Sequence, residues 1–312
     1  MSTTTATAGR ATRRPGDRAF SGTARGAGIF ILVILAGVAA FLLVEAWPAI
    51  AAPAEDVPGG EGLLVYVAPL VFGTLYSAVL ALLIATPLAV AIALFISHFA
   101  PRRLATPLGY VVDLLAAVPS IIYGLWGLAV VAPLLGELGV WLEANVGFLP
   151  FFTGPASATG RTMLTAAVVL AVMILPIITA VSREVFLQTP VLHEEAALAL
   201  GATRWEMIRT AVIPFGKPGV ISASMLGLGR ALGETMAVAI VLSVSGGITF
   251  TLVTAGNPAT IAANIALQFP ESTGIAVNTL IFSGLVLFVI TLAVNMFARW
   301  IIARRAEFSG AN

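Results

Sequence analysis

The amino-acid sequence predicts an all-α integral membrane protein with six transmembrane helices. Of the 312 residues, 59% are hydrophobic and only 10% are charged, whereas a soluble domain carries about 25% charged residues. Six separate apolar runs are long enough to cross a bilayer, which takes about 20 residues. Basic residues gather at alternate ends of these runs, as they do in proteins that cross a membrane repeatedly. A soluble helical core is excluded because too few charges remain to cover six such helices.

The predicted spans are continuous apolar runs separated by polar or glycine- and proline-rich connections. They cover approximately residues 28–48, 70–98, 108–133, 162–183, 218–244 and 274–302. The second and third exceed the length that a bilayer needs, so we expect them to tilt or to bend at Pro87 and Pro119. The transmembrane domain is therefore predicted to cover residues 28–305.

The two ends of the chain are polar. Residues 1–27 are rich in Thr, Ala, Gly and Arg without periodicity, which predicts a disordered tail, and residues 306–312 form a second short tail. A cleaved signal peptide is the alternative for the N-terminal region. The run from Gly28 to Trp47 is too long for it and lacks a suitable cleavage site, so the first span is expected to remain.

The charges of the connections predict the orientation. Basic residues gather in the N-terminal tail, in the second and fourth connections and at the C-terminal end: Arg10, Arg13, Arg14, Arg18, Arg25, Arg102, Arg103, Arg183, Arg204, Arg209, Lys217, Arg299, Arg304 and Arg305. Cytoplasmic loops are enriched in Arg and Lys, so both termini and their tails are predicted to be cytoplasmic. The third connection, residues 134–161, is unusually apolar and is expected to lie on the membrane surface or against an external protein.

The fourth connection, about residues 189–214, predicts two short helices joined at an angle. Val191–Leu200 forms the first, and Gly201 suits the position after it, where a positive φ is needed. A T-x-x-E capping box that begins at Thr203 predicts the second helix, which is expected to end at Pro214. Such a compact element fits a groove on another protein; a helix lying on the membrane surface is the alternative.

The fifth predicted span carries two charges inside an apolar run. Arg230 follows Pro218, where the span begins, by about 18 Å along a helix, near the middle of a bilayer. A charge there costs about 2.5–3.5 kcal/mol. Glu234 is four residues further on, on the same helical face and within pairing distance. Gly229 and Gly233 offer a small surface on which a neighbouring helix can pack closely.

Two interpretations of this pair are open. It is either a structural ion pair that locks two helices or an anion checkpoint in a translocation path, since a guanidinium offers a planar set of donors suited to an oxyanion. Asp113, in the third span, is a weaker candidate for the same path. It either pairs across helices or reaches the membrane interface.

The fourth connection resembles the cytoplasmic loop of ABC importer permeases. That family shares E-A-A-x3-G-x9-I-x-L-P, and this chain has Glu195-Ala196-Ala197-x3-Gly201-x9-Ala211-x-Ile213-Pro214. Ala211 and Ile213 depart from the family's Ile and Leu, while the E-A-A-x3-G core is intact. The resemblance implies a coupling helix that contacts a separate ATPase through four residues: Glu195, Ala196, Ala197 and Gly201.

Two further segments resemble the C-type permease of the Pst phosphate importer. They are Gly227–Ala237 (G-L-G-R-A-L-G-E-T-M-A) and Asp113–Gly124 (D-L-L-A-A-V-P-S-I-I-Y-G), where that subunit more often begins with Glu. The similarity covers about residues 28–305. It implies the six-helix architecture of type I ABC importer permeases, a location in the bacterial cell membrane and a phosphate path that includes Arg230 and Glu234. Glu234 either accepts the proton that phosphate keeps and sulfate lacks or only orients Arg230.

The resemblance also implies an assembly. Its other members would be a second, A-type permease, a dimer of ATPase subunits that binds ATP and Mg²⁺, an extracytoplasmic phosphate-binding protein and the membrane lipid. This chain has no G-x-x-x-x-G-K-[ST] loop, so we expect no cofactor in the chain and no ATPase site of its own.

Other classes fit the sequence less well. A permease for another oxyanion and a secondary transporter stay open, although a docking loop has no purpose in the latter. An intramembrane enzyme or a metal site lacks support because no Ser/His/Asp arrangement occurs, and the two histidines, His98 and His193, are far apart. The absence of cysteine excludes disulfides, and a net charge of +1 argues against a nucleic-acid partner.

Overall fold

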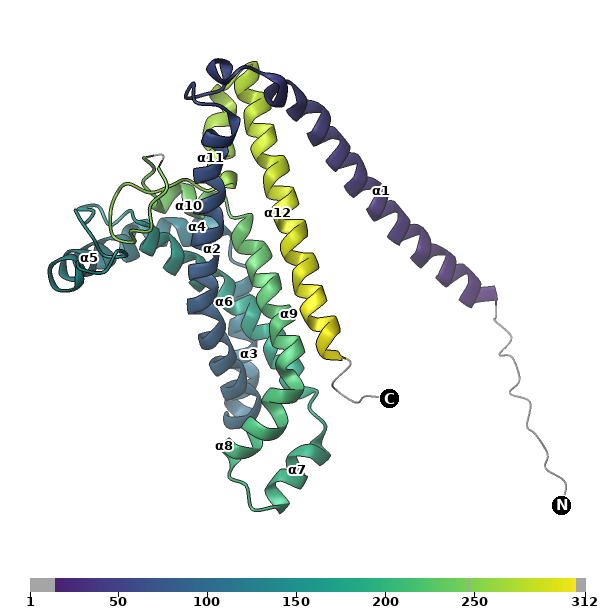
Figure 1. Ribbon diagram of the computed structural model, residues 1–312. Helices are drawn as coiled ribbons and strands as arrows, with labels where there is room; N and C mark the ends of the chain where they lie inside the picture. Colours follow the sequence, from purple (N-terminus) through teal and green to yellow (C-terminus); the bar gives the residue numbers. More distant parts are fainter. Residues whose placement is uncertain (1–14, 246, 307–312) are drawn as a thin grey trace.

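The computed structural model describes residues 15–245 and 247–306, and most of their helices run side by side in an elongated bundle (Figure 1). Within these residues the chain forms helices, turns and two isolated β-bridges. Six helical segments of the described chain are long and apolar enough to cross a membrane: Ala19–Ala51, Leu63–Phe99, Ser120–Val146, Met163–Leu187, Arg204–Leu232 and Ile275–Trp300. The predicted number of spans is confirmed, and the boundaries of the third and fifth differ from the prediction.

The long helices are joined by short helices and by π-helical and 3-10 turns. In chain order the elements are α1 (Pro15–Ala51), η1 (Ala54–Asp56), α2 (Leu63–Leu94), η2 (Phe95–Phe99), α3 (Arg102–Ala116), α4 (Ser120–Trp126), η3 (Gly127–Val131), α5 (Ala132–Val146), α6 (Met163–Leu187), α7 (Val191–Ala199), α8 (Arg204–Met207), η4 (Ile208–Val212), α9 (Ile213–Leu232), α10 (Met236–Val241), α11 (Ile261–Gln268), η5 (Phe269–Glu271) and α12 (Ile275–Ala306).

Helix α6 is the centre of the bundle, and α2 and α9 pack along it. The buried face of α2 carries alanines spaced three or four residues apart, all of them fully buried: Ala78, Ala81, Ala85 and Ala89. α9 approaches through glycine instead. A Cβ atom at Gly227 would lie 2.8 Å from the side chain of Ile178, so no larger residue fits without a shift. Small residues therefore bring three backbones close together in the core.

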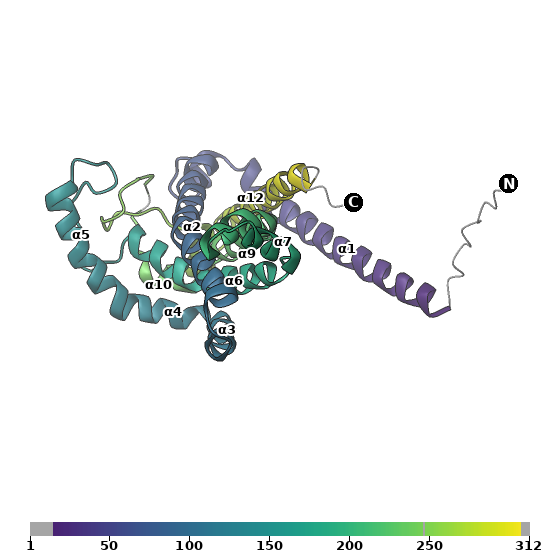
Figure 2. The same ribbon diagram turned by 90° about the horizontal axis from the view of Figure 1, so that it is seen from below.

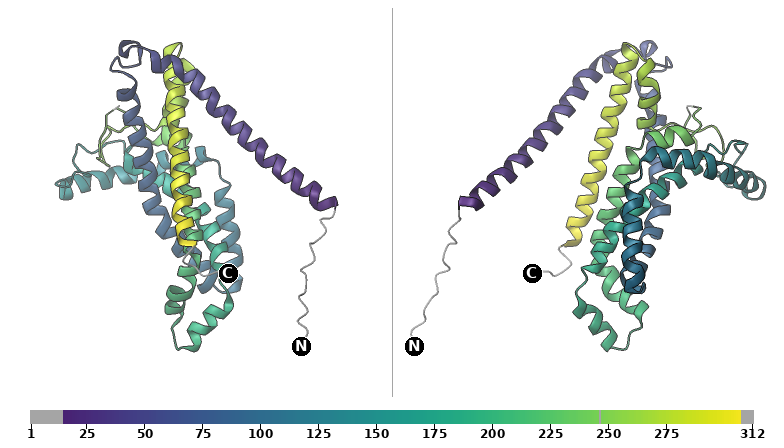
Figure 3. Two further views of the ribbon diagram at one scale, coloured as in Figure 1. Left: turned by 45° about the vertical axis from the view of Figure 1, so that its right-hand side comes forward. Right: turned by 180° about the vertical axis from the view of Figure 1, so that it is seen from behind.

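Helix α1 leaves the bundle at an angle (Figures 1 and 3). Only its last turns meet α12, where Ala46 and Ala49 are buried and Asn278 Nδ2 donates to the carbonyl oxygen of Glu45 at 2.6 Å. α1 begins at Pro15, so the predicted disordered tail is wrong for residues 15–27, which extend the apolar helix. Residues 1–14 and 307–312 of the predicted tails lie outside the described residues.

The third predicted span is not a single helix. α3 ends at Ala116 and α4 begins at Ser120, because Pro119 lacks an N–H group and disfavours helical backbone at the residue before it. The Tyr123 hydroxyl bridges the break by donating to the carbonyl oxygen of Leu115 at 2.8 Å. Beyond the break the chain changes direction: α4 packs against α10, and α5 extends away from the bundle (Figure 2). By length and apolar character, the third segment able to cross a membrane is Ser120–Val146 rather than 108–133.

The fifth span begins earlier and ends earlier than predicted. The helix continues from Arg204 to Leu232, so Pro214 does not end it. The π-helical turn η4 explains why the helix continues past Pro214. In this turn the backbone hydrogen bonds span five residues, as between Ile213 N and the Ile208 carbonyl, so the missing N–H of Pro214 falls where the pattern changes. The helix stops instead at Leu232, and the segment to Val241 resumes as the short helix α10.

The connections at the end of the bundle opposite α7 are fixed by side-chain hydrogen bonds. Asn257 is fully buried; its Nδ2 donates to the carbonyls of Ser243 and Thr254, and its Oδ1 accepts from Met163 N at 3.2 Å. The third connection is helical through α5, and Trp141 is 58% exposed there. Contact of this connection with the membrane surface or with a partner stays a prediction.

Candidate translocation site and docking loop

The two helix breaks meet inside the molecule. α4 packs on α10, and a Cβ atom at Gly124 would lie only 2.9 Å from Ala237 Cα. The next turn is equally close, because a Cβ at Gly127 would lie 2.9 Å from the side chain of Val241. Glycines thus let two short helices, each following a break, lie directly against each other.

Both breaks lie near the middle of α6. On the α9 side, Gly227 packs against Ile174 and Ile178, which lie in the middle of α6. The break in α9 follows Gly227 by less than two helical turns. On the α3 side, Gly109 lies against Arg183 near the end of α6, and the break begins about 12 Å further along α3. The two breaks therefore lie near the middle of the bundle along α6, and the position of Arg230 at the bilayer midplane stays a prediction.

Arg230 lies in the last turn of α9 and is half-buried. Its Nε atom is buried, and no hydrogen-bond acceptor for it is found in the described residues. The guanidinium lies within Coulombic range of the Tyr123 hydroxyl at the other break. A cation at a helix C-terminus is favoured by the helix dipole, which offsets part of the cost of burying it.

Glu234 does not form the predicted ion pair with Arg230. α9 ends at Leu232, so the four-residue spacing no longer places both side chains on one helical face. Glu234 is 7% exposed, and its Oε1 accepts from the backbone N–H of Ala237 at 3.0 Å. The carboxylate therefore stabilises the N-terminal turn of α10, and within residues 15–245 and 247–306 no salt bridge connects it to an arginine.

The predicted close packing at Gly229 and Gly233 is not found within the described chain. A Cβ atom at Gly229 would meet no atom within 4 Å, and one at Gly233 would meet only the Gly229 carbonyl oxygen at 3.8 Å. Gly229 lies on the side of α9 opposite Gly227, which faces α6, and Gly233 follows the end of α9. The small-residue surface beside Arg230 is therefore open.

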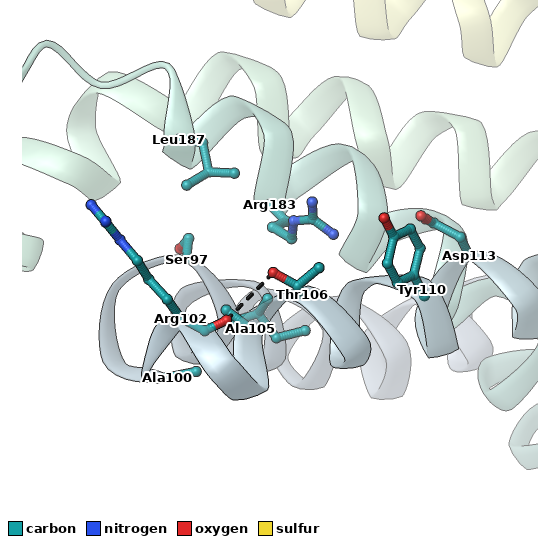
Figure 4. A pocket seen from close by; sticks show the side chains of 10 residues that line it. Ser97, Ala100, Arg102, Ala105, Thr106, Tyr110, Asp113, Arg183 and Leu187 are labelled. Carbon is teal, nitrogen blue, oxygen red and sulfur yellow. Dashed lines mark hydrogen bonds between the residues drawn. The ribbon is translucent and has the colours of Figure 1, made fainter.

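Asp113 lies away from Arg230 and Glu234. It is exposed on α3 and lines a pocket of about 370 Å³ near the end of the bundle that carries α7. The Arg183 guanidinium lies between α6 and α3 in the same pocket, as Figure 4 shows. The structure thus separates the three predicted path residues into a central pair and a peripheral carboxylate.

The docking loop has the predicted local geometry. α7 covers Val191–Ala199, Gly201 has a φ of 86°, and the Thr203–Glu206 capping box is formed in both directions. Glu195 and Ala196 are exposed, whereas Ala197 is half-buried against the cluster that includes Met207. α7 and α8 form the far end of the molecule (Figure 1).

One contact of the docking loop could not be found from the sequence. His98 Nε2 lies 3.4 Å from Glu194 Oε1, and His98 Nδ1 lies 2.7 Å from Ser97 Oγ. The contact between His98 and Glu194 links α7 to the end of the second span, and the two residues are 96 positions apart in the sequence. No sequence motif includes both residues, so the contact could not be predicted. Groups of three or more potential metal ligands are absent from the part of the chain that the structure describes.

The geometry suits passage of an anion better than covalent chemistry. Arg230 offers donors at a break where backbone groups are free of helical bonding, a pattern that membrane transporters use at mid-depth. Glu234 has one oxygen engaged by the backbone and supplies no nucleophile–base pair with a neighbour.

Comparison with known proteins identifies the family of the chain. Residues 85–306 match the family described as binding-protein-dependent transport system inner membrane component. The chain is 47% identical over 298 residues to the phosphate transport system permease protein PstC 2 of Mycobacterium tuberculosis, covering 92% of this chain and 91% of that protein. It is 43% identical to PstC of Mycobacterium leprae, covering 97% and 98%, and 38% identical to PstC of Haemophilus influenzae, covering 90% and 91%.

Solved structures share the fold. A chain of a bacterial ABC transporter involved in alginate import superimposes with a TM-score of 0.56 at 17% identity, covering 92% of this chain and 99% of that chain. A chain of the MetNI methionine ABC transporter, in an inward facing conformation, gives 0.54 at 16% identity, covering 77% and 95%. The architecture is that of type I ABC importer permeases. With a family model that spans most of the membrane domain and relatives aligned over nearly its whole length, the chain belongs to the family of binding-protein-dependent transport system inner membrane components.

Proposed function

We propose that this chain is the transmembrane permease subunit of an ATP-driven phosphate importer, with an anion path beside Arg230. The observation that carries the proposal is the half-buried guanidinium of Arg230, whose Nε has no acceptor in the described residues, at the meeting point of two helix breaks. The curated relatives are named as phosphate transport permeases, which supports phosphate as the anion.

The contribution of Arg230 is electrostatic. A guanidinium in a medium of low dielectric attracts an oxyanion more strongly than in water, and its planar donors match two oxygens at once. Because residues 15–245 and 247–306 supply no carboxylate within ion-pair distance of it, its charge is available to a passing ion. Glu234 holds α10 in place and shapes the site without neutralising the arginine.

The docking loop would couple the path to a separate ATPase that binds ATP and Mg²⁺. The exposed Glu195 and Ala196 and the turn at Gly201 form the surface offered to that subunit. Closure of the ATPase dimer would move α7, and the His98–Glu194 contact would carry this movement to the second span. The spans would then alternate between outward and inward access.

The open surfaces fit further partners. A second, A-type permease would cover Gly229 and Gly233 and pack along the free part of α1, whose apolar side chains are exposed in this chain. An extracytoplasmic phosphate-binding protein would deliver the ion at the end opposite α7. Both termini are cytoplasmic in this proposal, in agreement with α12 ending towards the same end of the molecule as α7 (Figure 3).

The test is uptake of labelled phosphate by cells that lack their own importer and receive this chain with its three presumed partners. We expect Arg230→Gln to reduce uptake about 10- to 100-fold, since a hydrogen bond to a charged group contributes about 1.5–3 kcal/mol. Arg304→Gln is the matched control, because Arg304 is exposed at the end of α12, over the ring of Trp300. Both variants must reach wild-type abundance in the membrane.

Excess sulfate is the competitor in this assay. Phosphate uptake that resists sulfate and is lost only in Arg230→Gln supports the proposal. Equal uptake by both variants would assign Arg230 to packing alone. Uptake of a different oxyanion in place of phosphate would replace the proposed substrate, and uptake without the ATPase would replace the class of transporter.

A further inference from the structure

A second polar pocket lies apart from the central site. It is lined by η2, α3 and the C-terminal end of α6, and its volume is about 370 Å³, within the range of small-molecule sites of about 300–1,000 Å³. Two arginines, three hydroxyl groups and one carboxylate line it: Arg102, Arg183, Ser97, Thr106, Tyr110 and Asp113. The transport path as proposed above uses none of these groups except the weak candidate Asp113.

We propose that this pocket binds a singly charged phosphate group, either the headgroup of a membrane phospholipid or a free phosphate ion. The lining holds two guanidinium groups and one carboxylate, so it offers donors for phosphate oxygens and an acceptor for a proton or an ammonium group on the same ligand. Guanidinium is the side-chain group best suited to phosphate oxygens. Basic pockets between transmembrane helices on the cytoplasmic side are known to suit lipid headgroups.

Arg183 is held at the wall of the pocket. Its guanidinium lies directly over Gly109 of α3, where any side chain would collide with it, and 24% of the side chain is exposed. One nitrogen, Nη2, lies 3.1 Å from Glu184 Oε1, outside the lining of the pocket. The guanidinium is therefore fixed in position while one edge stays available.

The polar groups gather at one end of the pocket. Figure 4 shows the guanidinium of Arg183, the hydroxyl of Tyr110 and the carboxylate of Asp113 turned towards the same region, with Arg102 at the other end. Thr106 Oγ1 is engaged by the Arg102 carbonyl at 3.4 Å, a long contact that a ligand can replace. A phosphate group at this end would meet the Arg183 guanidinium, the Tyr110 hydroxyl and the Asp113 carboxylate.

Asp113 defines the charge of the ligand. A doubly charged phosphate would be repelled by this carboxylate, whereas a phosphate that keeps a proton, or a headgroup with an ammonium group, can donate to it. Phosphatidylethanolamine has both the single negative phosphate and the ammonium. Among lipids, the pocket should therefore prefer phosphatidylethanolamine to phosphatidylglycerol.

The surroundings of the pocket are apolar. On α3, Leu104 is 52% exposed, Val111 50% and Leu114 69%, so the helix offers an apolar surface next to the polar cavity. In a chain that crosses the membrane, such a surface suits acyl chains. A polar cavity beside an apolar surface is complementary to a phospholipid, whose headgroup would enter the cavity while its acyl chains lie along the helix.

The site can be tested independently of the transport path. Arg183 lies nine residues beyond Ile174 on α6, about 13 Å further from the middle of the bundle. Only the free-ion form of the proposal depends on phosphate being the transported ion. If the chain proves not to transport phosphate, the proposal that the pocket binds a lipid headgroup is unaffected. Lipid binding and phosphate-ion binding are therefore measured in separate experiments.

The lipid arm uses the full complex, purified in mild detergent and analysed by native mass spectrometry after addition of phosphatidylethanolamine or phosphatidylglycerol. We expect Arg183→Gln to retain at least threefold less phosphatidylethanolamine than the wild type. Arg209→Gln is the matched control, since this exposed arginine near the same end does not line the pocket. Asp113→Asn should remove the preference for phosphatidylethanolamine over phosphatidylglycerol.

The ion arm measures binding of labelled inorganic phosphate to the delipidated complex, with Arg230→Gln present in every sample to silence the central site. Saturable binding that Arg183→Gln lowers at least threefold assigns the pocket to the free ion. Where Arg183→Gln fails to assemble, Tyr110→Phe and Arg102→Gln give the same two readouts from the exposed edge of the pocket. Unchanged lipid retention together with unchanged ion binding in these variants would overturn the proposal.

Discussion

Two sets of helices cross this protein in different ways. α2 and α6 run through without a break and bury small and aliphatic side chains against each other, and α2 carries no charged residue. The α3–α4 and α9–α10 pairs are each interrupted near mid-depth, and Arg230 and Glu234 lie at the second interruption. Continuous helices thus provide the rigid frame, while the broken ones provide charge and free backbone groups where an ion must pass.

The largest effect that can test this difference is overpacking of the frame. Gly227→Leu would force a side chain into Ile178, which we expect to lower the free energy of unfolding by about 1–3 kcal/mol. Gly229→Leu is the matched control on the same helix, since its Cβ meets nothing within 4 Å. The measurement is thermal unfolding of the purified chain in detergent. Equal stability of the two variants would contradict the close α6–α9 contact.

The sequence predicts the local features of the molecule well. The positive φ at Gly201 and the Thr203–Glu206 capping box were predictable because a few neighbouring residues determine them. The number of spans was predictable because a bilayer imposes length and apolar character on each.

The sequence does not predict features that depend on distant contacts. Pro214 predicts the end of a helix, yet the helix continues, because the π-helical turn before it removes the need for its N–H. Glu234 was expected to pair with Arg230, but the break at Leu232 arises where α10 packs on α4, more than 100 residues earlier in the chain. The sequence also does not distinguish Gly227 from Gly229. Only the fold shows that Gly227 packs against Ile178 while Gly229 has no neighbour within the described residues.

An intermediate effect is expected at the first break. Tyr123→Phe removes the hydroxyl that donates to the Leu115 carbonyl across the break, which should cost about 1 kcal/mol of stability. Tyr110→Phe is the matched control, because Tyr110 is exposed on α3 and its hydroxyl has no hydrogen-bond partner within the described residues. Thermal unfolding of both variants in the same detergent measures the difference. A loss of the same size in the control would mean that the bridge does not stabilise the break.

The smallest effect on stability is expected at the second break. Glu234→Gln keeps an oxygen that can accept from Ala237 N–H but loses the charge at the start of α10, so stability should fall by less than about 1 kcal/mol. The capping contact predicts that the preference for phosphate over sulfate stays unchanged in competition uptake. A reduced preference would instead support direct acceptance of the phosphate proton by Glu234. Glu271→Gln, at an exposed position near the start of α12, is the control.

The contact between α1 and α12 has a consequence for biosynthesis. The Glu45–Asn278 hydrogen bond joins residues 233 positions apart, so the first span to enter the membrane meets its neighbour only when the last one is made. At about 5–20 residues per second, the ribosome needs roughly 10–50 s to synthesise the intervening chain. During this interval α1 has only lipid or another subunit to pack against. The first span of the nascent chain is therefore available for binding to another subunit before the chain's own helical bundle is complete.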